Sequence, residues 1–558
     1  MISPFFSPDW RRETLARLDR PFDLVVLGGG ITGCGVLMEA AQRGLSVLLL
    51  EKGDLASGTS SRSSKLLHGG LRYLKQGKLH LTRLSCRERD RRLRLNPELA
   101  RPLRFVYPVR RGDPVPAWAM GLGLWLYDRF AERVPGGPRE HRRLSRDQAR
   151  KLAPELGLAP GETAFSYGDG VADDARLTRA VAATGVAAGG RLLLRAEALE
   201  LPRDARGRIS GVVFRDLETG ASHTVHARLV VNAAGVWVDR VRERAGLSGR
   251  RLRPSRGSHL VFACDRLPLS AAAAAPSPDD GRPVFLIPHP EGVLAGTTDL
   301  FHDGPLDDPR PTAEEAGYLL RAAQSLFPDR HLDAADVVGA FAGLRPILDD
   351  RATDPSKASR DEAIWEEEGL LSVTGGKLTT WRVMAEEAVD EALRLLDPVP
   401  SRRSVSAGTA LAGRAPEDLG ERLAAHWQAS HGAPREVALA AARRLRGGAP
   451  WLPRLARDDR ELHPLVDGGD LCAAEVRAHL ALGAVLRLED LLLRRVRLGM
   501  WDPPQAQELA PRLRNVFREE LGWDATRWER EEESCARALE SWRTPYIQTS
   551  TTKPQYST

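Results

Sequence analysis

Three glycines and an acidic residue near the start of the chain have the types and the spacing that bind a dinucleotide. Gly28, Gly30 and Gly33 fall in one short run, and Glu51 follows Gly30 by 21 residues. Gly28 permits a tight turn, Gly30 lets the backbone approach a pyrophosphate, and Gly33 lets a helix pack closely on a strand. The N–H groups at the start of that helix can bind the phosphates, and the carboxylate of Glu51 can accept hydrogen bonds from ribose hydroxyls.

The segments around these residues supply the elements that a dinucleotide site needs. An apolar strand is expected over residues 23–27, directly before the turn, and a helix rich in small residues follows the turn. A second apolar strand is expected over residues 47–50, directly before Glu51. A glycine turn alone is a weak signal, but the strand–turn–helix–strand order with its terminal acid is specific. We therefore predict a Rossmann-like βαβ unit over residues 21–55.

The composition is that of a globular protein with several domains. The chain has 558 residues, 42% hydrophobic and 28% charged, and this length exceeds one ordinary hydrophobic core. The net charge of +6 comes without a nucleic-acid recognition motif, so no nucleic-acid partner is expected. No apolar run reaches the roughly 18 residues that span a bilayer, and no secretory signal is expected. The cysteines lack a C-x-x-C pair and any metal-ligand spacing, which favours a reduced, cytoplasmic setting without a bound metal: Cys34, Cys86, Cys264, Cys472 and Cys535.

The remaining sequence alternates between strand-rich and helical patterns. A buried strand that ends in small residues is expected over residues 228–235, and a strand, a glycine turn and a helix follow from Leu370. A hairpin is expected over residues 284–298. The alanine- and proline-rich residues 270–283 are predicted to form a loop. From about residue 400 the pattern is helical.

Further short motifs follow the dinucleotide turn. They combine glycine with serine, threonine, histidine and basic residues, and they are Thr59-Ser60-Ser61, Lys65-Leu66-Leu67-His68-Gly69-Gly70-Leu71-Arg72-Tyr73, Asp173-Asp174-Ala175-Arg176-Leu177, Gly257-Ser258-His259, Gly296-Thr297-Thr298-Asp299, Gly343-Leu344-Arg345-Pro346 and Gly375-Gly376-Lys377-Leu378-Thr379-Thr380. In this order the set closely resembles the aerobic, FAD-dependent glycerol-3-phosphate dehydrogenases, densely over residues 20–395 and more loosely beyond. The blocks that contain His68 and Lys377 are the most specific.

The resemblance implies an α/β fold. Its parts are a two-dinucleotide-binding (Rossmann-like) FAD domain, a β-rich substrate domain and an all-α C-terminal domain. The implied ranges are 1–80, 145–255 and 335–395 for the FAD-binding domain, 81–144 and 256–334 for the substrate-binding and membrane-facing domain, 400–543 for the helical C-terminal domain, and 544–558 for a disordered tail.

In function, the resemblance implies that FAD oxidises sn-glycerol 3-phosphate to dihydroxyacetone phosphate and that the electrons pass to a membrane quinone. It also implies a homodimer, peripheral on the cytoplasmic face of the cell membrane. A close alternative is an oxidase that passes the electrons to oxygen instead of a quinone. The two enzymes differ in the access of oxygen to the flavin, which the sequence does not show. Another amine- or hydroxy-acid-oxidising flavoenzyme, a non-catalytic flavin-binding membrane module and an NAD-linked enzyme agree less well with the motifs.

The polar residues of these motifs suit that chemistry. A histidine with a pKa near neutrality can accept the C2 hydroxyl proton; His259 is the first candidate, and His68, expected near the flavin, is the second. Arg345 can polarise the developing oxygen. The planar fork of arginine suits a phosphate. The resemblance places substrate binding at Arg72, Tyr73, Lys377 and Thr379.

The expected cofactor-binding set combines glycines with small polar residues. Glycine turns bring backbone N–H groups close to a ring or a pyrophosphate, and serine hydroxyls can reach the phosphates. The set is Gly28, Gly30, Gly33, Glu51, Thr59, Ser60, Ser61, His68, Gly69, Ala234, Gly235, Gly375 and Gly376.

Residues 115–127 form an apolar segment that contains Trp118 and Trp125. The segment is too short to span a bilayer, but it suits either an anionic headgroup layer or a core. Flanking cations favour the headgroup layer, and they are Arg83, Arg87, Arg89, Arg91, Arg92, Arg94, Arg104, Arg110, Arg111, Arg129 and Arg133.

Overall fold

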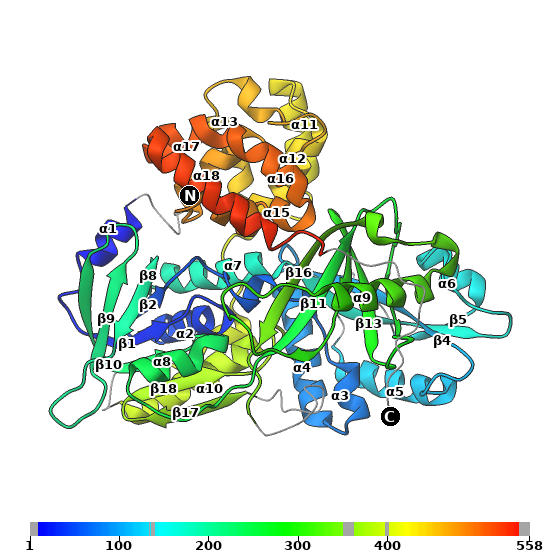
Figure 1. The fold of residues 1–558 in the computed structure, drawn as a ribbon, viewed down its shortest axis with the longest axis horizontal. Coiled ribbons are helices and arrows are strands. Elements are labelled where there is room, and N and C mark those ends of the chain that lie inside the picture. Colours follow the sequence, from blue (N-terminus) through cyan, green and yellow to red (C-terminus); the bar gives the residue numbers. More distant parts are fainter. Residues whose placement is uncertain (1–8, 133, 135–139, 350–361, 397–400, 546–558) are drawn as a thin grey trace.

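The computed structural model describes residues 9–132, 134, 140–349, 362–396 and 401–545. Within these residues, two large sheets form the lower part of the molecule as drawn in Figure 1, and a helical domain rests on them. The α/β fold with a helical C-terminal domain is confirmed.

The first sheet is built on the predicted βαβ unit. Its strand order is β17-β18-β10-β1-β2-β7, and the β8–β9 pair continues β10. The central strands pair in parallel, and their apolar runs are buried on both faces, as covered parallel sheets require. The strands are β1 (Phe22–Leu27), β2 (Val47–Glu51), β7 (Arg191–Leu194), β8 (Ala196–Glu200), β9 (Gly211–Asp216), β10 (Ser222–Asn232), β17 (Ala363–Glu367) and β18 (Leu370–Thr374).

Helices cover both faces of this sheet. On one face, three helices form a core with the strands: α2 (Ile31–Gln42), α7 (Asp174–Ala187) and α10 (Trp381–Leu395). The other face packs against the β8–β9 pair, α1 (Trp10–Leu15) and α8 (Val238–Arg244).

The second sheet is mostly antiparallel. Its order is β15-β11-β14-β13-β12-β4-β6-β3, with β16 beside β11 and β5 beside β6. The strands are β3 (Leu66–Leu67), β4 (Ala100–Val109), β5 (Arg142–Leu144), β6 (Thr163–Ala172), β11 (Ser255–Phe262), β12 (Ala272–Pro276), β13 (Pro283–His289), β14 (Gly292–Gly296), β15 (Leu300–Phe301) and β16 (Val337–Arg345). The hairpin predicted over residues 284–298 is β13 and β14. The associated helices are α3 (Leu71–Lys75), α4 (Leu79–Leu95), α5 (Ala117–Phe130), α6 (Arg146–Leu152) and α9 (Ala313–Leu326).

One sequence prediction about this sheet is wrong. The segment predicted as a loop, residues 270–283, contains β12, whose alanines are buried between β13, β4 and α9. Alanine is a poor strand former, but packing decides here, because these alanines are buried in one core with neighbouring strands and α9. The ranges 1–80, 145–255 and 335–395, expected for the FAD-binding domain, also contain β3, β6 and β16, which belong to the second sheet, and these domain bounds stay a prediction.

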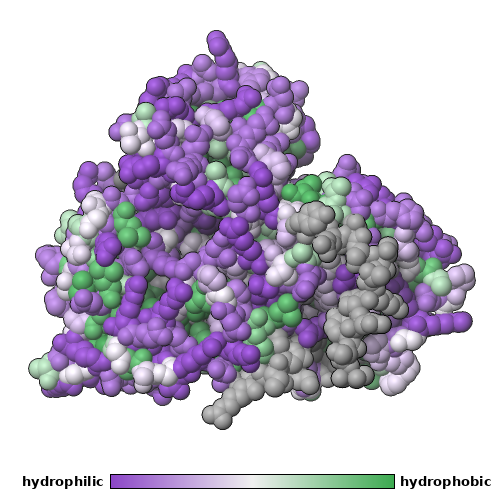
Figure 2. Space-filling view, viewed as in Figure 1, coloured by the Kyte–Doolittle hydropathy of each residue, from purple (hydrophilic) through white to green (hydrophobic). Residues whose placement is uncertain are grey.

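The C-terminal region is helical, as predicted. Its helices are α11 (Leu419–His431), α12 (Arg435–Leu445), α13 (Leu452–Leu455), α14 (Ala473–Leu482), the π-helix η8 (Asp490–Arg495), α15 (Leu498–Trp501), α16 (Pro503–Leu509), α17 (Arg514–Leu521) and α18 (Ala525–Glu540). The apolar side chains from α14 to α18 share one core with the second sheet, whereas those of α11, α12 and α13 form a separate core. The outer surface of the region in Figure 2 is largely hydrophilic. The tail predicted to be disordered lies almost wholly outside the described residues. Within the described part of the chain, no helix is long and apolar enough to cross a membrane.

Candidate active site

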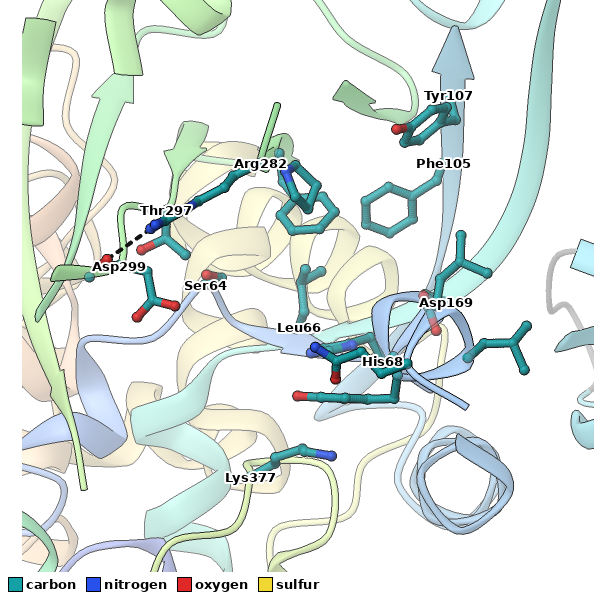
Figure 3. Close-up of a pocket in the computed structure, with 18 of the residues that line it drawn as sticks. Ser64, Leu66, His68, Phe105, Tyr107, Asp169, Arg282, Thr297, Asp299 and Lys377 are labelled. Carbon is teal, nitrogen blue, oxygen red and sulfur yellow. Dashed lines mark hydrogen bonds between the residues drawn. The ribbon is translucent and has the colours of Figure 1, made fainter. Parts of the chain in front are cut away.

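A cavity of about 1120 Å³ lies against the second sheet, beside α3 and α5 (Figure 3). Its wall collects predicted site residues from distant parts of the chain: His68, Tyr73, His259, Arg345, Gly376, Lys377 and Thr379. The fold therefore brings the motif residues of the sequence to one place.

His259 lies on β11 and is only 2% exposed. Its Nε2 lies 2.8 Å from the Oγ of Ser64, and its ring stacks on Phe341 of β16 with centroids 4.8 Å apart. Burial, reinforced by the positive charges of Arg345 and Lys65, holds the pKa of His259 well below its usual 6.5. The imidazole is therefore neutral near pH 7 and able to accept a proton.

Arg345 ends β16 at the wall of the cavity. Its Nη1 donates to Asp299 Oδ1 over 3.2 Å, and its Nη2 donates to Thr297 Oγ1 over 3.1 Å. Gly257 on β11 leaves room for this guanidinium, because a Cβ there would collide with Nη2. The structure thus holds a cation in fixed orientation beside the cavity that His259 also lines.

The two most specific sequence blocks meet at the opposite wall. The ammonium of Lys377 lies 3.6 Å from the centroid of the Tyr73 ring, a cation–π contact. The Thr379 hydroxyl accepts a hydrogen bond from the His68 amide at 3.1 Å and donates to the His68 carbonyl at 3.3 Å. Thr379 therefore fixes the backbone of the wall. The backbone of Arg72 lies in α3, and its side chain falls outside what the structure describes.

The dinucleotide turn joins β1 to α2, as predicted. The backbone of Gly28 is left-handed, with φ of +115°, and a Cβ there would lie 2.6 Å from the carbonyl oxygen of Ala233. A Cβ on Gly33 would collide with the carbonyl oxygen of Gly28. Gly30 is the N-cap of α2, so the N–H groups of the first turn face outward beside it. These contacts are the steric reasons for the glycine spacing.

Glu51 ends β2 with its carboxylate buried. Its Oε2 accepts a hydrogen bond from the Gly29 amide at 2.5 Å, and its Oε1 accepts one from the Gly53 amide at 2.6 Å. Burial raises the pKa of Glu51 despite these two bonds. Each carboxylate oxygen retains a lone pair, so the group can still accept a hydrogen bond from a ribose hydroxyl.

The three hydroxyls of Thr59, Ser60 and Ser61 have different partners. Ser60 Oγ accepts a hydrogen bond from the Ile31 amide at 2.9 Å, at the start of α2. Thr59 Oγ1 donates to the Leu344 carbonyl at 2.5 Å, and Ser61 Oγ donates to the carbonyl of Gly58 at 3.4 Å. Of the three, Ser60 therefore has the position expected for a phosphate contact, and the other two tie the loop to its surroundings.

The remaining predicted cofactor residues follow neighbouring strands. Ala234 and Gly235 come directly after β10, and Gly375 and Gly376 come directly after β18. Because β1, β10 and β18 are parallel neighbours, their carboxyl ends meet at one edge of the sheet. This edge fits FAD: it offers helix N–H groups, glycine turns and an acid. Gly69 is held by Asp169, whose Oδ1 accepts from its amide at 3.1 Å.

Several cavity residues were not singled out from the sequence. Ser64 contacts His259, and Asp299 contacts Arg345. Arg282 donates from Nη1 to the Asp299 carbonyl at 2.9 Å and also lines the cavity. Asp299 was visible as the last residue of its motif, but Arg282 lies in the connection between β12 and β13, where the sequence showed no chemical motif. Ser64 carried no signal beyond ordinary loop polarity.

Comparisons with known proteins agree with this geometry. A family model described as FAD dependent oxidoreductase matches residues 23–391, and one described as the C-terminal domain of alpha-glycerophosphate oxidase matches residues 407–528. The chain is 35% identical to glycerol-3-phosphate dehydrogenase 2 of Mycobacterium tuberculosis over 95% of this chain and 92% of that protein. It is 37% identical to the aerobic glycerol-3-phosphate dehydrogenase of Staphylococcus haemolyticus over 66% of each chain.

Among solved structures, the glycerol-3-phosphate dehydrogenase of Bacillus halodurans complexed with FAD has a TM-score of 0.77 and 28% identity, over 98% of this chain and 100% of that chain. The L-alpha-glycerophosphate oxidase of Mycoplasma pneumoniae, at 19% identity and a TM-score of 0.50 over 70% of this chain and 98% of that chain, shares the fold. The chain belongs to the FAD-dependent glycerol-3-phosphate dehydrogenase family.

Proposed function

We propose that this protein oxidises sn-glycerol 3-phosphate to dihydroxyacetone phosphate and passes the electrons to a membrane quinone. The observation that carries the proposal is the composition of the cavity wall, which combines His259, Arg345 and Lys377 with an apolar set. The apolar set comes from β4, β13 and α5, and it is Phe105, Phe285, Ala119, Met120, Leu122, Gly123 and Leu126. A phosphorylated alcohol suits the polar part of the wall, and a lipid-soluble acceptor suits the apolar part.

The polar residues suggest how the alcohol is oxidised. Lys377 and Arg345 supply positive charge for the phosphate and for the reacting oxygen, so that phosphate binding helps to orient C2. Neutral His259 accepts the C2 hydroxyl proton, and Ser64 fixes the orientation of its ring. When bound, FAD would accept the C2 hydrogen together with two electrons, as a hydride. His68 remains the second candidate for the base, because it also lines the cavity.

Helix α5 supports a membrane position. Trp118, Leu122 and Trp125 lie on one face of the helix and are 75%, 59% and 49% exposed. The opposite face buries Leu124 and Tyr127 in the core. A helix with an apolar exposed face is typical of proteins that lie in a lipid headgroup layer. Because Leu122 also lines the cavity, a quinone can reach the cavity from this face.

The cations around α5 differ from the sequence prediction. Arg89 and Arg92 are buried, and Arg89 is paired with Asp169. Arg110 donates to backbone carbonyls, including that of Ser325 at 2.8 Å. Arg133 lies outside the described residues. The exposed cations that remain for anionic lipid are Arg83, Arg87, Arg94, Arg104, Arg111 and Arg129. A peripheral homodimer on the cytoplasmic face of the cell membrane remains part of the proposal.

One experiment separates quinone from oxygen as the acceptor. The purified protein is reduced anaerobically with sn-glycerol 3-phosphate and then mixed with a quinone analogue or with oxygen. We expect fast reoxidation by the quinone and slow reoxidation by oxygen. The reverse result identifies an oxidase, and no reduction by the substrate contradicts the substrate assignment.

The variant Leu122→Glu tests whether quinone reaches the cavity from the exposed face of α5. It should slow reoxidation by quinone about tenfold or more, because a carboxylate on the cavity wall stays hydrated and disfavours an apolar ligand beside it, while reduction by sn-glycerol 3-phosphate stays normal. The matched control is Val405→Glu, an equally exposed apolar residue at 56% that does not line the cavity. Equal effects of the two variants would argue against this route.

A further inference from the structure

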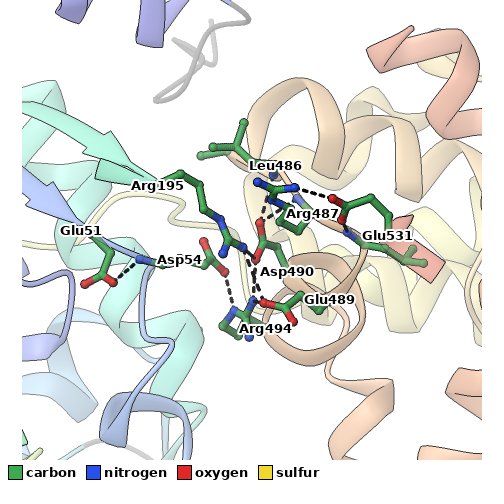
Figure 4. Close-up of polar contacts among 12 residues, drawn as sticks. Glu51, Asp54, Arg195, Leu486, Arg487, Glu489, Asp490, Arg494 and Glu531 are labelled. Atoms are coloured by element: carbon green, nitrogen blue, oxygen red, sulfur yellow. Dashed lines mark hydrogen bonds and ion pairs between the residues drawn. The ribbon is translucent and has the colours of Figure 1, made fainter. Parts of the chain in front are cut away.

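A buried acid lies directly beside the dinucleotide site and is bound from the helical domain. Asp54 follows Glu51 by three residues and is 1% exposed. Its Oδ2 accepts from Arg494 Nε at 2.6 Å (Figure 4). Arg495 donates from Nη1 to the same oxygen and from Nη2 to Oδ1, both at 2.7 Å. Both arginines belong to η8 of the C-terminal domain. We refer to Asp54, Arg494 and Arg495 as the interdomain clamp.

The helix that carries the arginines has an unusual geometry. In η8 the amide of Val496 donates to the carbonyl of Leu491 at 2.9 Å, which is the i→i+5 bond of a π-helix. Such turns are rare and are frequent at functional sites. In this turn the consecutive residues Arg494 and Arg495 contact the same carboxylate. An ordinary α-turn separates the directions of consecutive side chains more widely.

The turn that the clamp holds also supports the cofactor residues. The Gly53 amide donates to the Glu51 carboxylate at 2.6 Å, and the Ala56 amide donates to the Gly29 carbonyl at 3.0 Å. Ala56 is left-handed, with φ of +61°. A non-glycine residue in that region persists only where its surroundings hold it. Asp54 lies between these two contacts, so whatever fixes Asp54 also fixes the glycine turn and the acid.

The clamp belongs to a larger buried set of charges. Arg494 also donates from Nη2 to Asp490 Oδ1 at 2.5 Å, and Arg195 Nη2 donates to the same oxygen at 2.6 Å. The arginines hold the pKa of Asp54 well below its usual range despite its burial. Burying ion pairs costs desolvation energy, so such a pair is weak evidence for stability. Removing one partner leaves a buried charge uncompensated, which is strongly destabilising. The arrangement therefore fixes the position of Asp54 relative to η8.

We propose that the C-terminal helical domain completes the FAD site through the interdomain clamp, with Asp54, Arg494 and Arg495 as positioning residues for Glu51 and the glycine turn. The proposal rests on FAD as the cofactor and is independent of the substrate and of the electron acceptor. Its test is therefore the affinity for FAD.

The first variant is Asp54→Asn, which keeps the shape and removes the charge. Holoprotein is diluted in steps, and the FAD released is followed by its fluorescence to give the dissociation constant. We expect the constant to rise about tenfold or more, as for the loss of a buried charged contact. The matched control is Glu475→Gln. Glu475 is a fully buried carboxylate that accepts two hydrogen bonds from Arg444, at 2.6 and 2.8 Å, and both residues lie within the C-terminal domain.

A second variant separates the effect of hydrogen-bond geometry at Asp54 from the effect of charge. Arg495→Lys keeps the charge but loses the fork that binds both oxygens of Asp54, and we expect FAD to bind at least threefold more weakly. Circular dichroism identifies folded variants, and Arg495→Lys provides the measurement if Asp54→Asn does not fold. An FAD affinity within twofold of the parent in Arg495→Lys overturns the proposal. Equal weakening by Glu475→Gln and Asp54→Asn also overturns it, because the effect then reflects general destabilisation of the domain.

Discussion

The dinucleotide turn and the cavity of the candidate active site are built in opposite ways. The turn is one continuous strand–turn–helix segment, and Gly28 and Gly33 act there through the absence of a side chain. The cavity takes His259 from β11, Arg345 from β16 and Lys377 from the turn after β18, and it depends on side-chain atoms. A site made of backbone is fixed by local steric rules, whereas a site made of side chains needs the sheet to bring separate strands together.

Two glycines illustrate this difference between a local and a long-range requirement. A Cβ on Gly33 would strike the backbone of the same turn, at Gly28, whereas a Cβ on Gly257 would strike the guanidinium of Arg345, which is far away in sequence. The first requirement can be inferred from the spacing alone. The second becomes visible only when β11 and β16 are paired.

The broadest effect should come from breaking the local site, because every step that needs FAD is lost with the cofactor. Gly33→Ala places a methyl group against the Gly28 carbonyl, so the turn must move away from the pyrophosphate position. We expect FAD content to fall about tenfold or more in protein that remains folded. The control is Gly408→Ala, whose Cβ would meet open space. Flavin content equal to that of the parent in Gly33→Ala would show that the turn tolerates the methyl group.

Breaking the discontinuous site should leave the cofactor bound. Arg345→Ala and Lys377→Ala each remove a cation from the cavity wall, and we expect turnover of glycerol 3-phosphate to fall by about a hundredfold or more. The flavin absorption spectrum should stay unchanged in both. Arg435→Ala, which removes an exposed ion pair with Glu421, is the control and should keep full turnover. Near-normal turnover in both cavity variants would contradict their placement in the substrate site.

The exposed face of α5 tests whether the cavity side of the molecule is the lipid side. Trp118→Ser combined with Trp125→Ser removes two exposed aromatic groups, and we expect binding to anionic liposomes to weaken about tenfold or more. The measurement is cosedimentation with vesicles at low salt. Val405→Ser removes an exposed apolar group elsewhere and should not change binding. If the parent protein does not bind vesicles, α5 is not a membrane anchor.

The smallest effect concerns the pH dependence of the base. The pKa of His259 is lowered by burial, then by Arg345 and then by Lys65, so its neutral form is lost only as the pH falls well below 6.5. Lys65→Met removes one of these positive charges, and the pKa should rise toward 6.5. The acid limb of turnover at saturating substrate should therefore move to higher pH, by about one unit or less. A shift to lower pH, or an unchanged limb in folded protein, would mean that His259 is not the titrating base.

The dinucleotide site and the motif residues of the cavity were predictable for different reasons. Gly28, Gly30, Gly33 and Glu51 followed from spacing and from the flanking strands, and the structure gives a steric reason for Gly28 and Gly33 and a hydrogen-bonding reason for Glu51. His259 and Arg345 followed from the family resemblance. Their hydrogen bonds to Ser64 and Asp299 did not, because a hydrogen bond between distant segments leaves no periodic signal in the sequence.

The sequence by itself determined the βαβ unit, the cofactor class and the helical character of the C-terminal region, since these depend on local spacing and apolar periodicity. Only the tertiary structure decided the rest. In the tertiary structure a run of alanines forms the buried strand β12, β6 and β16 belong to the second sheet, and the tryptophans of α5 are exposed. The tertiary structure also places Arg494 and Arg495 on Asp54. The physical reason is that burial and pairing depend on neighbours that are distant in the chain, and no local pattern specifies them.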